Sequence, residues 1–190
     1  MATTDLFIKN MVCPRCVKVV TATVAAQRLE IKDIQLGKVT LAGTVTPQQL
    51  QALSTALQQE GFLLIDDKKQ QLVAGIKSII VQAVHHSDLD EMKENFSTLL
   101  AGKLQKDYHY LSNLFSEAEG TTIEQYIILQ KIERVKELLV YNELSLSEIS
   151  YKLGYSSVAH LSAQFKKVTG LTPSKFKQLK VPVRIPIDKL

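Results

Sequence analysis

The chain has 190 residues, of which 45% are hydrophobic and 22% are charged. This composition is that of an ordinary globular protein with enough apolar material for a core, and the length allows one large domain or two small ones. The sequence has no secretory segment at its start and no apolar run near the length of a membrane span, so we expect a cytoplasmic protein. Its net charge of +4 is modest.

Residues 1–67 alternate short apolar runs with two helical patterns. Strands are predicted at residues 6–8, 31–36, 38–41 and 62–65, and helices at 13–28 and 46–60. Gly37 marks a hairpin turn, and Thr46 with Gln49 provides a capped start for the second helix. The resulting order βαββαβ predicts a ferredoxin-like, split-βαβ domain over residues 1–67.

Two cysteines lie in the loop between the first strand and the first helix, in the run NMVCPRC at residues 10–16. In a chain without an export signal, this spacing favours free thiols over a structural disulfide. Thiolates at a helix N-terminus feel the positive end of the helix dipole, and Arg15 adds a positive charge, so their pKa should fall. Two soft sulfurs suit a low-coordinate soft ion, chiefly Cu(I), whereas zinc normally takes four ligands.

This loop resembles the Gly-Met-x-Cys-x-x-Cys motif of the heavy-metal-associated domain of copper chaperones and transport ATPases, with Asn10 in place of the glycine. The resemblance implies a metal site made by Cys13 and Cys16, with Met11 as a further candidate ligand. A redox-sensing dithiol and a vestigial site that only packs remain open alternatives. His85 and His86 are adjacent on a predicted helix and point in different directions, so we expect them to be surface or core residues.

The second part of the chain is helical and contains an internal repeat. It begins with a predicted connecting helix at residues 68–87, which we assign to the helical part as its first helix. The domain that contains the two repeated units follows at residues 88–180. Residues 110–122 (YLSNLFSEAEGTT) then recur as 160–172 (HLSAQFKKVTGLT), with Leu, Ser, Phe, Gly and Thr at matching positions. A repeat of this kind indicates a duplicated structural unit. The two copies are joined by a long helical pattern at residues 122–142.

The copy near the C-terminus has the pattern of a helix-turn-helix. Ser145 and Glu148 form a capping box, and Gly154 stands where a left-handed residue ends the first helix. Ser157 caps a second helix, in which Leu161 and Phe165 share one face. A helix, a tight glycine turn and a second helix with an exposed outer face are typical of a motif that enters the DNA major groove.

The segment from Gly154 to Phe176, which includes Thr172-Pro173, resembles the second helix-turn-helix of the AraC-type DNA-binding domain. The resemblance extends back through residues 122–139 and more weakly to about residue 70. It implies two helix-turn-helix units held apart by the long helix, with DNA as the partner. The upstream unit is irregular, because its predicted turn at residues 104–107 is one residue shorter and lacks the glycine.

The resemblance also implies which side chains face the DNA bases. These are His109, Ser112 and Asn113 in the first unit, and Ala159, Ser162 and Ala163 in the second. Related regulators often carry Arg or Gln at such positions, and neither reading face of this chain has an arginine. Bidentate guanine recognition is therefore not expected, and adenine pairing by Asn113 with thymine-methyl contacts by the alanines would favour an A/T-leaning site.

Basic residues concentrate beside the second unit. Residues 88–120 hold seven acidic and three basic residues, whereas residues 121–190 hold six acidic and eleven basic ones. We expect the second unit to supply most of the phosphate affinity, since that affinity grows with the number of cations brought to the backbone. The candidate phosphate contacts are Ser157, Lys166, Lys167, Lys175, Lys177 and Lys180. Residues 181–190 are expected to form an extended tail.

Taken together, the sequence predicts an α+β protein: a ferredoxin-like domain followed by an all-α domain with two helix-turn-helix units. The function it favours is a bacterial-type transcription regulator modulated by Cu(I) or by thiol redox state at Cys13 and Cys16. The alternative is a metal-trafficking or scaffold protein whose helical half binds another protein. No nucleotide-binding glycine loop, catalytic triad or paired carboxylates are recognisable, so an enzyme is not expected.

Overall fold

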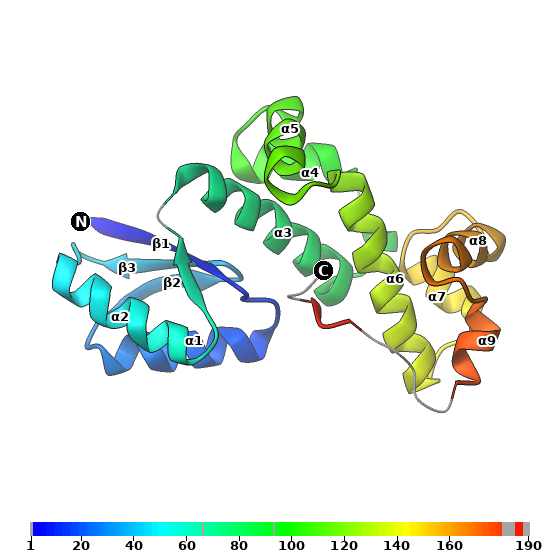
Figure 1. Ribbon diagram of the computed structural model, residues 1–190, viewed down its shortest axis with the longest axis horizontal. Coiled ribbons are helices and arrows are strands. Elements are labelled where there is room, and N and C mark those ends of the chain that lie inside the picture. The colour runs from blue at the N-terminus through cyan, green and yellow to red at the C-terminus, as the bar shows by residue number, and fades with distance from the viewer. Residues whose placement is uncertain (1, 66, 93, 180–184, 188–190) are drawn as a thin grey trace.

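The computed structural model describes residues 2–65, 67–92, 94–179 and 185–187, and it contains a sheet domain followed by a bundle of helices (Figure 1). The predicted fold class is therefore confirmed. The elements of the sheet domain are β1 (Thr3–Lys9), α1 (Pro14–Ala26), β2 (Ile31–Gln35), β3 (Lys38–Ala42), α2 (Pro47–Gln59) and β4 (Leu63–Ile65). Within the described residues, no helix is both long enough and apolar enough to cross a membrane.

The four strands form one antiparallel sheet in the order β2-β3-β1-β4, as a split-βαβ fold requires. Leu6 and Ile8 alternate toward the helices and pack in one core with Val24 of α1 and Leu57 of α2. β1 is longer than the sequence predicts because Thr3 and Thr4 continue the pairing with β3. A polar residue is no obstacle there, since this end of the strand is largely exposed.

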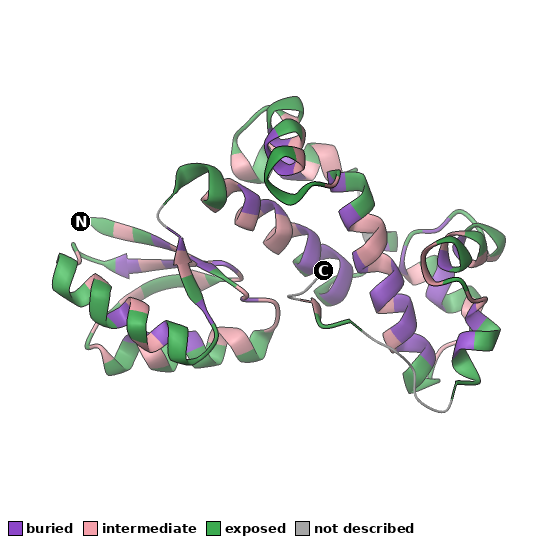
Figure 2. Cartoon of the chain, in the orientation of Figure 1, coloured by how far each residue is buried: buried purple, intermediate pink, exposed green. Residues whose placement is uncertain are grey.

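The helical part consists of one long helix and two repeated units around a second long helix. Its elements are α3 (Lys68–His86), a 3₁₀ turn at Leu89–Glu91, α4 (Phe96–Leu104), α5 (Tyr108–Glu119), α6 (Ile123–Tyr141), α7 (Leu146–Lys152), α8 (Val158–Thr169) and α9 (Pro173–Lys177). They share a single apolar core, and burial runs along the length of α3 and α6 (Figure 2).

The two repeats have matching local structure. α5 and α8 are both 12 residues long, and the paired residues Leu111/Leu161 and Phe115/Phe165 are fully buried. The predicted capping box of Ser145 with Glu148 is present at the start of α7. In the second unit Gly154 takes the left-handed φ of 64° in the turn before α8. In the first unit Gln105 takes that conformation, with φ 51°, which explains how the turn forms without glycine.

Among the described residues, three of the contacts between the sheet domain and α3 are spaced along this helix. The Gln71 side-chain amide donates a hydrogen bond to the Ile65 carbonyl (2.8 Å), and the His86 Nε2 donates one to the Val12 carbonyl (2.9 Å). Between them, the β2–β3 turn comes so close to Ser78 that a Cβ on Gly37 would lie 2.4 Å from the serine Oγ. Only glycine fits that position, where φ is also 81°.

Phe165 is the central side chain of the second unit, so its truncation should destabilise the protein. The ring is fully buried and meets Phe176 of α9 edge to face, with the ring centroids 5.5 Å apart. We expect Phe165→Ala to lower the free energy of unfolding by about 3–5 kcal/mol, as measured by urea denaturation. The neighbouring exposed change Lys166→Ala should stay within about 0.5 kcal/mol of wild type. Equal losses for the two variants would contradict this packing.

Candidate nucleic-acid interface and thiol site

The outer face of α8 is exposed and carries small side chains. Leu161 and Phe165 are buried on its inner face, and Ala159 and Ala163 are exposed, with Ser162 half-buried. The helix is held at its start by Ser157, whose side chain accepts a hydrogen bond from the His160 amide. α8 thus presents small side chains outward, so the surrounding backbone can approach a base-pair edge closely.

The outer face of α5 is more polar. His109 and Asn113 are exposed and Ser112 is half-buried. The Asn113 Nδ2 lies 3.2 Å from the His109 Nε2, so the amide donates to the imidazole one helical turn away. Asn113 is exposed beside this imidazole, and an exposed amide suits a group that pairs with adenine.

α6 separates the two units. α5 packs near its start and α8 farther along it, so the two candidate reading helices lie on either side of α6 (Figure 1). With 19 residues, α6 is about 28 Å long at 1.5 Å per residue. That length is comparable to the spacing of about 34 Å between successive turns of the DNA major groove.

Exposed lysines flank α8. Lys166 and Lys167 lie in its last turn, and Lys175 and Lys177 lie on the short helix α9. Lys180 lies outside the described residues. The four described side chains make no ion pair with any part of the chain that the structure describes, so their ammonium groups remain available for phosphate.

His160 is a further exposed residue on α8 that the sequence reasoning missed. Its Nδ1 lies 3.0 Å from the Ser156 Oγ, and its ring meets Tyr155 edge to face. The imidazole is therefore held in place beside Ala159. In the sequence repeat His160 occupies the position that matches Tyr110 of α5, which is also exposed. This match is the signal that could have identified His160 from the sequence.

The cysteines form a close pair at the start of α1. Cys13 is the N-cap residue and its Sγ lies 3.3 Å from the Sγ of Cys16; both residues are half-buried. Asn10 takes a φ of 75° and its Nδ2 donates to the Gly61 carbonyl, which shows how asparagine replaces the motif's glycine. The loop is thereby fixed to the turn before β4.

The two thiols differ in acidity. Burial would raise the pKa of Cys13, but hydrogen bonds from Cys16 and Arg15 outweigh it, so the pKa lies below the ordinary thiol value of 9.0. Burial raises the pKa of Cys16 above that value, and the neighbouring Cys13 sulfur adds to the rise. The pair is thus arranged as one acidic thiol and one that keeps its proton.

The donor set around the pair is small. Among the described residues, no group of three or more His, Cys, Asp or Glu side chains gathers at one place. Met11 is 2% exposed and packs in the core of the sheet domain. His85 is buried against Gln130, and His86 bonds the Val12 carbonyl rather than facing the sulfurs. Two sulfur donors fit a low-coordinate soft ion better than tetrahedral zinc.

The helical part is similar to known regulators. Residues 100–179 match the family model described as a helix-turn-helix domain. Over 79 residues the chain is 34% identical to the Msm operon regulatory protein of Streptococcus mutans, covering 42% of this chain and 28% of that protein. Over 75 residues it is 33% identical to the xylose operon regulatory protein of Escherichia coli, covering 40% and 19%. The chain therefore spans less than a third of the length of these curated relatives.

A solved structure shares the fold. The C-terminal domain of AraT, a response regulator from Geobacillus stearothermophilus, superposes with a TM-score of 0.51 at 21% identity, over 59% of this chain and 88% of that one. The fold of this part is thus that of a helix-turn-helix domain, in agreement with the family model that matches residues 100–179. The resemblance of residues 1–67 to heavy-metal-associated domains stays a prediction.

The unequal acidity of the cysteines predicts unequal alkylation. At pH 7.5 a lowered pKa leaves more of Cys13 as the reactive thiolate, and a raised pKa leaves less of Cys16. We expect iodoacetamide to modify Cys13 first, with a rate that rises with pH and reaches its midpoint below 9.0. Trypsin cleaves after Arg15 and separates the two cysteines, so mass spectrometry of the peptides resolves them in the wild-type protein. Faster labelling of Cys16 would contradict the assignment.

Proposed function

We propose that this protein is a DNA-binding transcription regulator whose two helix-turn-helix units enter successive major grooves on one face of a duplex. The observation that carries the proposal is the exposed face of α8, in a part of the chain that matches the helix-turn-helix family model. Four lysines that make no ion pair with the described residues lie on α8 and α9. The relatives named above are regulatory proteins of operons, which supports the same role here.

The residues on the reading faces favour A/T-rich DNA. Ala159 and Ala163 suit contact with thymine methyl groups, and Asn113 suits adenine. In the absence of arginine at these positions, much of the affinity would come from phosphate contacts and DNA shape. Ser157, at the start of α8, still has a hydroxyl proton to donate to a phosphate oxygen while its oxygen accepts the His160 amide hydrogen bond.

A selection of random duplexes with the purified protein should therefore return A/T-rich half-sites about one helical turn apart. Gel-shift affinity for a selected site should fall steeply as salt increases, because phosphate contacts release counterions. Half-sites rich in G would reject the assignment of the reading faces. If no salt-sensitive DNA binding is found, the proposal of a transcription regulator is rejected. The alternative of a scaffold protein, which the acidic first unit favours, then remains.

Matched charge variants locate the phosphate contacts. The double change Lys166→Ala/Lys167→Ala should reduce the slope of log K against log salt by about 1.8, at about 0.9 per contact. The control Lys18→Ala/Lys32→Ala removes the same charge from exposed positions of the sheet domain and should leave the slope unchanged.

We further propose that the state of Cys13 and Cys16 modulates DNA affinity, through Cu(I) or through thiol oxidation. The two sulfurs would hold the ion, which would bridge them. The reduced dithiol has no such bridge. The argument for coupling is the position of the loop: Val12, next to Cys13, is hydrogen-bonded to His86 of α3. α3 in turn packs in the core of the helical domain, so a change in the loop can reach the DNA-binding units.

Copper titration of the reduced protein, in competition with a Cu(I) chelator, tests this proposal. We expect one ion per chain, lost in Cys13→Ser/Cys16→Ser. DNA affinity should change by about 5–150-fold on loading, the usual range of allosteric coupling. His86→Ala keeps both sulfurs, so it should bind copper normally while the change in DNA affinity shrinks. Weak copper binding with a reversible disulfide would favour redox sensing, and equal DNA affinity of the reduced, copper-loaded and oxidised protein would show that coupling is absent.

A further inference from the structure

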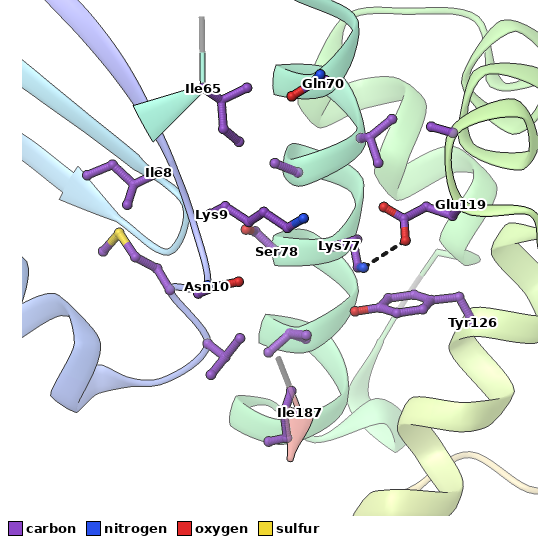
Figure 3. Close-up of a pocket in the computed structure, with 16 residues that line it drawn as sticks. Ile8, Lys9, Asn10, Ile65, Gln70, Lys77, Ser78, Glu119, Tyr126 and Ile187 are labelled. Atoms are coloured by element: carbon purple, nitrogen blue, oxygen red, sulfur yellow. Dashed lines mark hydrogen bonds and ion pairs between the residues drawn. The ribbon is translucent and has the colours of Figure 1, made fainter. Parts of the chain in front are cut away.

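A cavity of about 410 Å³ lies at the junction between the sheet domain and the helical domain (Figure 3). One wall comes from the end of β1 and the loop that leads to the cysteines, and the other from α3, with α5 and α6 behind it. This volume lies within the range of cavities that hold small organic ligands. Neither the DNA-binding face nor the thiol pair uses this space.

The walls of the cavity are mostly apolar and come from both domains. The lining includes Ile8, Met11, Ile65, Val73, Val81 and Tyr126, all of which are buried. Val81 and Ile65 belong to neither domain core, and both line the cavity. An apolar ligand body would gain from contact with these walls at about 25 cal/mol per Å² of buried apolar surface.

A few polar groups project into the same space. Lys77 forms an ion pair with Glu119 (2.9 Å), so these two charges cancel. Lys9 extends from the end of β1 toward α3, near Ser78 (Figure 3), and has no ion pair with any residue that the structure describes. The lining thus carries one uncompensated positive charge, beside a hydroxyl that can donate a hydrogen bond.

We propose that this cavity binds a small organic monoanion with an apolar body, of the carboxylic acid class. Its carboxylate pairs with the Lys9 ammonium and accepts a hydrogen bond from the Ser78 hydroxyl, and its apolar body lies between Val73, Val81 and Ile65. The Lys9 ammonium, on an exposed residue, attracts an anion and repels a cation, whereas a neutral apolar molecule gains nothing from this charge. The charge of the lining therefore selects the class of ligand.

Isothermal titration calorimetry of the full-length reduced protein with decanoate, without DNA, tests the proposal. We expect one site per chain, weakened about tenfold in Lys9→Gln, because a hydrogen bond to an exposed charge lies at the lower end of the range for charged groups. Lys9→Arg keeps the charge and should retain binding. Lys18→Gln removes an exposed charge of the same domain and should bind as wild type does. 1-Decanol should bind at least tenfold more weakly.

A second pair of variants tests the position of the site. Ala74 lines the cavity on α3, and Ala74→Leu should abolish binding by filling the space, with helicity checked by circular dichroism. Gln82→Leu adds the same side chain at an exposed position of α3 and should bind normally. The proposal is overturned if wild type does not bind decanoate, if 1-decanol binds equally well, or if Lys9→Gln and Ala74→Leu bind as their controls do. These results do not depend on DNA binding, so the regulator proposal can stand or fall separately.

Discussion

The packing of α3 on two sides is the constraint on which the arrangement of the molecule depends. One stripe of this helix, with Val73, Ile76 and Ile80, lies in the core of the helical domain. The other side meets the sheet domain through Gln71, Ser78 and His86. A helix held in this way cannot follow one domain without disturbing its contacts with the other, since packed cores deform little. It is therefore the natural element to link the thiol loop to the DNA-binding units.

Two adjacent histidines at the end of α3 show this division clearly. His85 points inward and its Nε2 lies 2.8 Å from the Gln130 Oε1, while the Gln130 amide donates to the Tyr126 hydroxyl at 3.0 Å. Burial lowers the pKa of His85 to about 4, so the imidazole is neutral at pH 7 and needs no counter-charge. This buried chain fixes α3 against α6, and α6 carries both repeated units. His86, one residue on, points to the other side and holds the Val12 carbonyl.

Local patterns predicted most of the elements, because each depends on residues close in sequence. The capping boxes at Thr46 and Ser145 and the duplicated Leu and Phe positions are of this kind, and the structure has all of them. The left-handed Gln105 was not predicted, since an ordinary side chain at such a position gives no signal. The junction was also beyond prediction. The approach of Gly37 to Ser78 joins residues about forty positions apart, and no periodicity encodes which surfaces of two domains will meet.

The two helix-turn-helix units are alike in backbone and different in chemistry, and the difference suggests a division of labour. The second unit has the glycine turn, the capping box and the unpaired lysines, so it combines an unstrained frame with the charge needed for phosphate affinity. The first unit accepts a left-handed glutamine, which costs about 1–2 kcal/mol, and its charged residues are mostly acidic. Its exposed asparagine is hydrogen-bonded to a histidine. Its charge opposes nonspecific attachment, so any net contribution to binding has to come from base contacts. Affinity would then reside in the second unit and discrimination among sites in the first, with α6 fixing the distance between them.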